Sequence, residues 1–147
     1  MIELEAIRMK VKVKLDAGAK MPTRAHRMDA GLDLYATKSE LIPPFSRKTF
    51  NTGVHVAIPE GFVGLLTSKS GLMAKQGITS RGTIDSGYTG SIRAVLFNNC
   101  SEEVYIEEGQ KITQLVILPI ITPELELVDD LEETERKDGG FGSSGKF

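Results

Sequence analysis

The chain has 147 residues, 40% of them apolar, which is enough to fill one hydrophobic core. Eighteen Lys and Arg residues against twenty Asp and Glu residues give a formal charge of -2, so no overall basic field favours nucleic acid, and a phosphorylated ligand needs a local basic pocket. One cysteine and two histidines exclude an internal disulfide and a Cys/His zinc cluster, and no apolar stretch is long enough for a membrane span or signal peptide. We therefore expect one soluble, cytoplasmic protein that binds neither nucleic acid nor membrane.

Short apolar runs, several of them alternating with polar residues, predict an all-β domain. At residues 9–15, for example, apolar side chains alternate with lysines. Turn signals such as Pro43-Pro44 separate the runs at spacings typical of sandwiches and barrels. The expected strands lie at residues 9–15, 54–58, 62–66, 92–97, 104–106 and 112–118, with a further one beginning after Gly31.

The segment at residues 30–36 places one carboxylate, Asp33, inside an otherwise apolar strand. A carboxylate buried in a strand needs a partner. Asp33 is either a turn residue satisfied by nearby backbone amides or a hard oxygen ligand for Mg²⁺, acting directly or through water. The second interpretation suits a metal that keeps most of its waters and takes phosphates as further partners.

A short helix is expected from Ser70 to Gln76, with Ser70 as the cap of its first turn. The cation Lys69, the hydroxyl of Ser70 and Gly71 therefore gather at the start of this helix. Free backbone N–H groups and the positive end of the helix dipole favour an anion there, and Gly71 permits a ligand to approach the backbone closely. The segment is a candidate phosphate site, although Lys-Ser-Gly also occurs often by chance.

Residues 82–90 place Asp85 and Tyr88 in a glycine-rich hairpin between strands. Asp85 fits either the opening of a β-turn or a group that positions and deprotonates an attacking water. Tyr88 fits either an amphipathic strand residue or a flat ring that packs against a sugar. The hairpin is thus a candidate catalytic and sugar-binding element.

Gln114 lies inside the expected strand at residues 112–118, and its neighbours are apolar. A buried glutamine must be satisfied, and a phosphate oxygen or an ordered water would do so. We therefore expect its amide to face a polar ligand.

Glycine and serine dominate the end of the chain, and this composition predicts a mobile tail over residues 136–147. The tail is either a solvated linker or a lid that orders over a ligand, with Phe141 as its contact surface. Arg136 supplies a planar cation, and Ser143 and Ser144 supply two hydroxyls. Such a strip can clamp a phosphate and cover a base at the same time.

These five segments, in this order and at these separations, resemble the five motifs of the homotrimeric dUTP pyrophosphatase (dUTPase) family. The resemblance spans residues 30–145, and residues 12–25 look like the family's opening strand. It implies a dUTPase-like jelly roll or β-barrel, expected here at residues 1–135, with one short helix and a flexible Gly/Ser-rich C-terminal arm as lid. It also implies hydrolysis of dUTP to dUMP and pyrophosphate, a Mg²⁺ cofactor, and a homotrimer whose active sites are shared between subunits.

The resemblance implies a role for each chemical group. Asp33 would anchor the hydrated Mg²⁺ that grips the triphosphate. Asp85 would orient and activate the water that attacks the α-phosphorus, and Gln114 would help to place phosphate and water. Tyr88 would lie under the deoxyribose so closely that a 2′-hydroxyl cannot fit, which would exclude UTP.

The remaining implied contacts bind substrate, with motifs one, two and four from one chain, motif three from a second and motif five from a third. Backbone groups of the hairpin would read the uracil edge, and the tail would cover the base and hold the γ-phosphate. The substrate-binding residues implied in this way are Lys69, Ser70, Gly71, Thr79, Gly82, Thr83, Ile84, Tyr88, Arg93, Arg136, Phe141, Gly142, Ser143 and Ser144.

The sequence departs from the family pattern at several motif positions. Lys69 stands where arginine is usual, so a point charge replaces a planar fork and bidentate phosphate geometry is lost. Thr79 stands where many members carry asparagine. Gln110, Lys111 and Thr113 replace three residues of the fourth motif.

Two other functions are compatible with the same fold. A dCTP deaminase needs a general acid/base carboxylate beside the base, usually Glu in that family, whereas this hairpin carries Asp85 beside Tyr88. A non-catalytic, nucleotide-binding regulatory trimer has no use for an Asp that positions water. His26, His55 and Cys100 have no partners at ligand spacing, and we expect them to be surface or packing residues.

Overall fold

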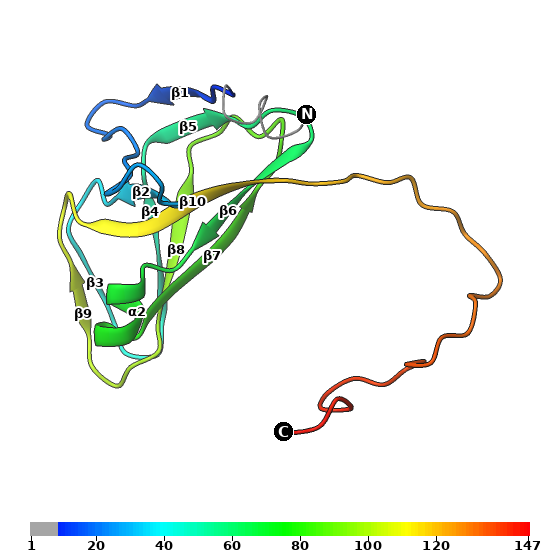
Figure 1. The fold of residues 1–147 in the computed structure, drawn as a ribbon. Coiled ribbons are helices and arrows are strands. Elements are labelled where there is room, and N and C mark those ends of the chain that lie inside the picture. Colours follow the sequence, from blue (N-terminus) through cyan, green and yellow to red (C-terminus); the bar gives the residue numbers. More distant parts are fainter. Residues whose placement is uncertain (1–8) are drawn as a thin grey trace.

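The structure is a computed structural model that describes residues 9–147, so the first eight residues of the expected domain 1–135 lie outside it. Its regular elements occupy the first four fifths of the chain (Figure 1). In chain order they are β1 (Lys12–Leu15), β2 (Leu32–Tyr35), β3 (Glu40–Ile42), β4 (Arg47–Asn51), β5 (Val54–Ala57), β6 (Phe62–Thr67), α2 (Ser70–Gln76), β7 (Ile78–Ile84), β8 (Arg93–Asn98), β9 (Val104–Ile106) and β10 (Lys111–Pro119).

The all-β prediction is confirmed, and each expected strand is present with ends that differ by a few residues at most. Three strands were not among those expected, namely β3, β4 and β7. β3 has three residues, and β4 buries a single apolar side chain, Phe50. β7 carries apolar residues only at its two ends, so neither alternation nor an apolar run marks these segments.

The helix has the bounds that were predicted, but the cap predicted for Ser70 is wrong. Lys69 occupies the cap position, and no side chain caps the first turn. Gly77 ends the helix in the left-handed conformation with φ 64°, and its N–H donates to the carbonyl of Met73 at 3.1 Å. Ser70 is therefore the first helical residue, and its hydroxyl is not used to hold the helix.

The strands form one six-stranded antiparallel sheet in the order β2-β10-β6-β7-β8-β4, and two small sheets, β1-β5 and β3-β9. The curled sheets wrap around a common interior, in agreement with the expected jelly-roll or β-barrel class (Figure 1). Strands distant in sequence thus become neighbours, because β10 lies between β2 and β6.

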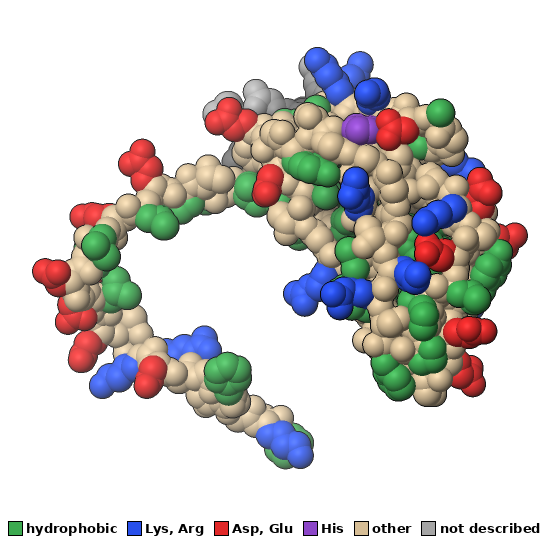
Figure 2. Space-filling model, turned by 180° about the vertical axis from the view of Figure 1, so that it is seen from behind, with side chains coloured by type: hydrophobic (Ala, Val, Ile, Leu, Met, Phe, Trp, Pro, Cys, Tyr) green, Lys and Arg blue, Asp and Glu red, His purple; other side chains and the backbone are tan. Residues whose placement is uncertain are grey.

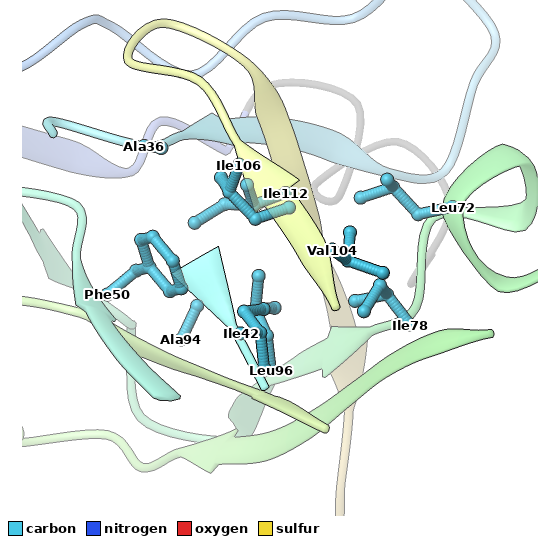
Figure 3. Packing of buried hydrophobic residues seen from close by; sticks show 10 residues of the cluster. All are labelled: Ala36, Ile42, Phe50, Leu72, Ile78, Ala94, Leu96, Val104, Ile106 and Ile112. Carbon is cyan, nitrogen blue, oxygen red and sulfur yellow. The ribbon is translucent and has the colours of Figure 1, made fainter. Parts of the chain in front are cut away.

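Two clusters of buried apolar side chains fill the interior. In the first, Phe50, Ile42 and Leu96 are fully buried and come from three different strands (Figure 3). Leu72 is the buried residue of α2 and fastens the helix to this cluster. Burial of each such large side chain contributes about 1.5 to 3 kcal/mol, so the helix that follows Lys69 has a fixed position.

After β10 the chain leaves the body as an extended arm, residues 120–147, which contains no helix or strand. Figure 1 shows the arm curving away from the sheets, and Figure 2 shows acidic and apolar side chains along it. Leu125 and Leu127 are 95% and 99% exposed. The extended part thus begins before residue 136, where the sequence placed the start of the lid; the mobility of residues 136–147 stays a prediction.

Candidate active site

The sheet brings three of the five motifs together in one line. Gln114 of β10 lies opposite Asp33 of β2 on one side and opposite Thr67 of β6 on the other. From Thr67 the chain continues into Lys69 and α2. A pocket of about 270 Å³ opens where these segments meet. Its lining residues are Ala25, Asp29, Ala30, Gly31, Asp33, Lys69, Gln114 and Val116.

Asp33 is 3% exposed, and its two partners are lysines. The Nζ of Lys69 lies 2.5 Å from Oδ1, and the Nζ of Lys111 lies 3.0 Å from Oδ2. Burial raises the pKa of Asp33, but the hydrogen bonds from the two lysines outweigh it and leave the pKa below its ordinary value of 3.8. The side chain is thus a charged carboxylate within a strand rather than a turn residue held by backbone amides.

The Gln114 side chain is positioned by two neighbours. Its Nε2 donates to the carbonyl of Ser68 at 3.1 Å, which ties β10 to the segment before α2. A Cβ on Gly31 would stand 2.1 Å from Oε1 of Gln114, so this side chain fits because residue 31 is glycine. Its partner in this chain is therefore a backbone carbonyl, and a contact with phosphate or water remains a prediction.

Beneath the pocket lies a network of buried hydroxyls that the sequence did not reveal. Oγ of Ser80 and Oγ1 of Thr113 are 2.7 Å apart, and Thr113 donates to the carbonyl of Thr67 at 3.0 Å. Ser68 Oγ donates to the carbonyl of Ser80 and accepts from its N–H. The network pins the Ser68 segment to β7, which explains why threonine is accommodated at position 113 of the fourth motif.

The start of α2 presents Ser70 and Gly71 to solvent. A Cβ on Gly71 would meet no atom within 4 Å, so packing within one chain does not require glycine there. Glycine inside a helix costs about 0.5 to 1 kcal/mol relative to alanine. A residue that weakens the helix without an internal reason is compatible with a ligand that approaches the backbone.

The hairpin after β7 carries Asp85 and Tyr88 on an exposed turn. The N–H of Tyr88 donates to the carbonyl of Asp85 at 3.1 Å, and Gly87 has φ 92°, so Asp85 does open a β-turn. Tyr88 lies outside any strand, and its hydroxyl donates to the carbonyl of Ser91 at 3.0 Å. A Cβ on Gly90 would stand 2.6 Å from that hydroxyl oxygen, so the ring rests on a glycine.

The other residues expected to read the base are spread along β7 and β8. Thr79 Oγ1 accepts a hydrogen bond from Asn99 at 3.0 Å, Gly82 packs near Leu66, and Ile84 is buried. Thr83 lies on β7 between the last two, and Arg93 begins β8 in an exposed position.

One chain does not bring the hairpin to the Asp33 pocket. In the sheet register Arg81 of β7 lies opposite Thr67, beside the pocket, and Asp85 follows four residues later. At about 3.3 Å per strand residue, this places Asp85 about 13 Å further along the sheet. Neither Asp85 nor Tyr88 lines the pocket.

The arm holds part of motif five in a local turn. Arg136, Ser143 and Ser144 line one hollow together with Glu135 and Gly139. Nε of Arg136 donates to the carbonyl of Gly139 at 2.7 Å. The ring of Phe141 is fully exposed, and Gly142 beside it has φ 96°. The structure thus gathers the expected phosphate contacts of the arm, but away from the body (Figure 1).

The donor groups at the pocket fit Mg²⁺ held through water. Among residues 9–147 no group of three or more His, Cys, Asp or Glu side chains could hold a metal by itself. Asp33 and Asp29 supply carboxylates beside two cations. This set suits a metal that keeps its waters and takes phosphates as ligands, rather than an ion held by protein alone.

No helix in the described part of the chain is long and apolar enough to cross a membrane.

Comparison with known proteins gives a consistent result. The dUTPase family model matches residues 17–145. The deoxyuridine 5'-triphosphate nucleotidohydrolase of Corynebacterium glutamicum is 42% identical over 99% of both chains, and that of Clostridium tetani is 40% identical over 94% of this chain and 97% of its own. The Staphylococcus bacteriophage 80alpha dUTPase with dUPNHPP superposes with a TM-score of 0.87 at 36% identity, over 93% of this chain and 99% of its own.

A dUTPase from phage phi11 of S. aureus, for which coordination of a structural Mg(II) ion is described, superposes with a TM-score of 0.78 at 35% identity, over 85% of this chain and all of its own. The family match runs from residue 17 to residue 145 and therefore covers all five motifs. The chain belongs to the dUTPase family.

Proposed function

We propose that the chain is a dUTP diphosphatase, which hydrolyses dUTP to dUMP and pyrophosphate with Mg²⁺ as cofactor in a cytoplasmic homotrimer. Membership of the family supports the reaction. The arrangement of the active sites between subunits is supported by the division of the motifs, because one chain joins Asp33, Lys69 and Gln114 but leaves the hairpin and the arm apart. The reaction removes dUTP before it can enter DNA and supplies dUMP.

The division of the motifs supports sites shared between subunits. The hairpin of a second chain and the arm of a third would complete the pocket of the first, which gives three equivalent sites in a trimer. Extended and exposed residues such as Leu125 and Leu127 give the arm the reach and the apolar surface for contacts outside its own body.

In the pocket, Asp33 would hold the hydrated metal, and Lys69, Ser70 and Gly71 would bind the phosphates. Bound there, Mg²⁺ supplies positive charge to the phosphate oxygens, where the transition state gathers negative charge. Lys69 and Lys111, which pair with Asp33, would turn from the carboxylate to the entering phosphates. Gln114, whose amide donates to the carbonyl of Ser68, would help to orient phosphate and water.

The hairpin would supply the attacking water and the selection of the nucleoside. Asp85 would orient the water and accept its proton while the water oxygen bonds to the α-phosphorus and pyrophosphate leaves. Tyr88, whose ring is held over Gly90, would pack under the deoxyribose and exclude a 2′-hydroxyl.

Backbone groups around Thr79, Gly82, Thr83, Ile84 and Arg93 would read the uracil edge. Cytosine presents an amino group where such a site expects a carbonyl, and each unpaired buried group costs about 1 to 3 kcal/mol.

The arm would close the site. Phe141 would stack on uracil, and Gly142 with its positive φ gives the backbone the bend that follows the ring. Arg136, Ser143 and Ser144, which already share one hollow, would hold the γ-phosphate. Such a lid excludes water other than the one held by Asp85.

A product assay tests the proposal. Pyrophosphate and ammonia release are measured from dUTP, UTP, dTTP and dCTP, each with and without Mg²⁺. We expect pyrophosphate from dUTP alone and only with the metal. Ammonia from dCTP would instead identify a deaminase, and binding of dUTP without any product would identify a regulatory trimer. Either result would refute the hydrolase.

A further inference from the structure

His55, at the second position of β5, contacts two groups that can only accept hydrogen bonds. Its Nδ1 lies 2.7 Å from the carbonyl oxygen of Thr89, and its Nε2 lies 3.0 Å from Oδ1 of Asp16. Neutral imidazole carries a proton on one nitrogen and can satisfy one of these acceptors. Both contacts together require the imidazolium, so the geometry belongs to protonated His55.

The charges around His55 favour this form. The hydrogen bond to Thr89 and the contact with Asp16 raise the pKa of His55 above its ordinary value of 6.5, against the opposing effects of burial and of Lys14. Lys14 lies opposite His55 in the β1–β5 register, and Lys12 and Lys14 line a cavity of about 320 Å³ together with His55 and Thr89. The His55 side chain is 20% exposed, so solvent can exchange its proton.

Thr89 belongs to the hairpin that carries the proposed catalytic and sugar-binding groups. It follows Tyr88 directly, and on the other side of Gly90 the hydroxyl of Ser91 donates to Oδ1 of Asn51. The hairpin is thus fastened to the body at two points, by His55 and by Asn51. The ring of Tyr88 rests on the glycine between them.

We propose that protonated His55 is a positioning residue that holds the hairpin so that Tyr88 can discriminate deoxyribose from ribose. The inference rests on the proposed function, because it assigns the consequence to dUTP and UTP. When His55 loses its proton, it can donate to only one of its two acceptors. The charged carboxylate of Asp16 is the stronger acceptor, so the remaining proton stays there and the contact with Thr89 is lost. A displacement of about 1 Å can cost up to about a hundredfold in rate, and Tyr88 excludes the 2′-hydroxyl only while its ring stays in place.

Two amide variants separate the two contacts of His55. The side-chain amide of asparagine stands near the Nδ1 position and can still donate to Thr89, whereas that of glutamine stands near Nε2 and can still donate to Asp16. The measurement is the ratio of kcat/KM for dUTP to kcat/KM for UTP across the pH range. His26→Gln serves as a matched control, since His26 is exposed and lies outside β5.

In the wild type we expect this ratio to fall as the pH rises through the pKa of His55. His55→Gln should lower the ratio about tenfold at low pH and keep this low value as the pH rises, whereas His55→Asn should stay within about twofold of the wild type at low pH and lose the pH dependence. This difference between the two variants would identify His55 as a residue that positions the hairpin rather than a packing residue. Equal ratios in the two variants would overturn the proposal.

A second readout does not depend on catalysis. The pKa of His55 is measured by titration of its ring protons. Protection of the amides of residues 85–91 against hydrogen exchange, corrected for the intrinsic rise of exchange with pH, should fall above this pKa and should be low at all pH values in His55→Gln. If no dUTP is hydrolysed, the proposed function fails while this measurement still stands. If protection of the hairpin in His55→Gln equals that of the wild type below the pKa of His55, the positioning role fails even where dUTP is hydrolysed.

Discussion

Asp33 is 3% exposed and held by two lysines, whereas Asp85 lies exposed on a turn and Phe141 is fully exposed on the arm. The pocket around Asp33 is built by strand register, buried hydroxyls and a glycine that makes room for Gln114. The hairpin and the arm are exposed, and neither of them lines the pocket. The two regions of one proposed site therefore differ in how much of their geometry a single chain fixes.

The difference indicates which functions need other subunits. The region that would hold metal and phosphates is formed before ligand binds, so little reorganisation is needed there. The groups that would handle water, sugar and base would come together only on the proposed assembly and closure. Substitutions in the hairpin and the arm should thus reduce turnover with little effect on stability, whereas substitutions in the pocket should change both.

The largest effect is expected for Asp85→Asn. Loss of the proton acceptor should lower kcat by about a thousandfold or more, because general-base catalysis contributes about 10² to 10⁴. Binding of dUTP and the midpoint of unfolding should stay near those of the wild type, since Asp85 is exposed. Steady-state kinetics and calorimetric titration measure both. Asp130→Asn, at an exposed position of the arm, is the control, and unchanged turnover in Asp85→Asn would remove Asp85 from the mechanism.

Deletion of residues 136–147 should lower kcat by about a hundredfold and preserve the proposed trimer, because the proposed lid would order the γ-phosphate and exclude water. Light scattering after gel filtration measures the assembly. Phe141→Ala and Phe147→Ala form a matched pair, since both rings are fully exposed. Only the first should raise KM for dUTP, and full activity of the truncated protein would rule out a lid.

Gly31→Ala should lower stability and should lower kcat about tenfold, because the new Cβ would stand 2.1 Å from Oε1 of Gln114. Displacement of that side chain should cost about 1 to 3 kcal/mol of unfolding free energy, measured in urea at fixed protein concentration. Gly71→Ala is the contrasting variant. Its Cβ meets open space, so it should stabilise the helix by about 0.5 to 1 kcal/mol and still weaken dUTP binding. Equal stability of both variants would contradict the comparison.

The sequence predicted the parts of the fold that carry a local signal. Helix α2 was placed at its true bounds because good helix formers lie between Ser70 and Gly77. β4 was missed because it buries one apolar residue, Phe50, and its remaining residues read as a polar loop. Its strand character comes from pairing with β8, which lies more than forty residues away and leaves no local pattern.

Within the candidate site, residue types were predictable and partners were not. The need of Asp33 for a partner was clear from its strand, but Lys69 and Lys111 reach it through pairings that only the folded sheet creates. His55 was expected to be a packing or surface residue, because Asp16 and Thr89 lie 39 and 34 residues from it in sequence. Contacts of this kind follow from topology, and a single sequence does not specify them.

The smallest effect is expected for a substitution of Lys69, where the family usually has arginine. This substitution tests whether the pocket is as fully formed as its buried contacts indicate. A guanidinium has five donors in a plane. Lys69→Arg can therefore keep the ion pair with Asp33 and offer a second pair of donors to phosphate, whereas a single ammonium does this less well. Binding of dUTP with Mg²⁺ should tighten about threefold to tenfold in a calorimetric titration, equal to about 1 kcal/mol. Lys75→Arg, exposed in the last turn of α2, should change nothing. Weaker binding in Lys69→Arg would mean that the planar fork stays locked on Asp33, so that the carboxylate competes with the substrate instead of yielding its lysines to it.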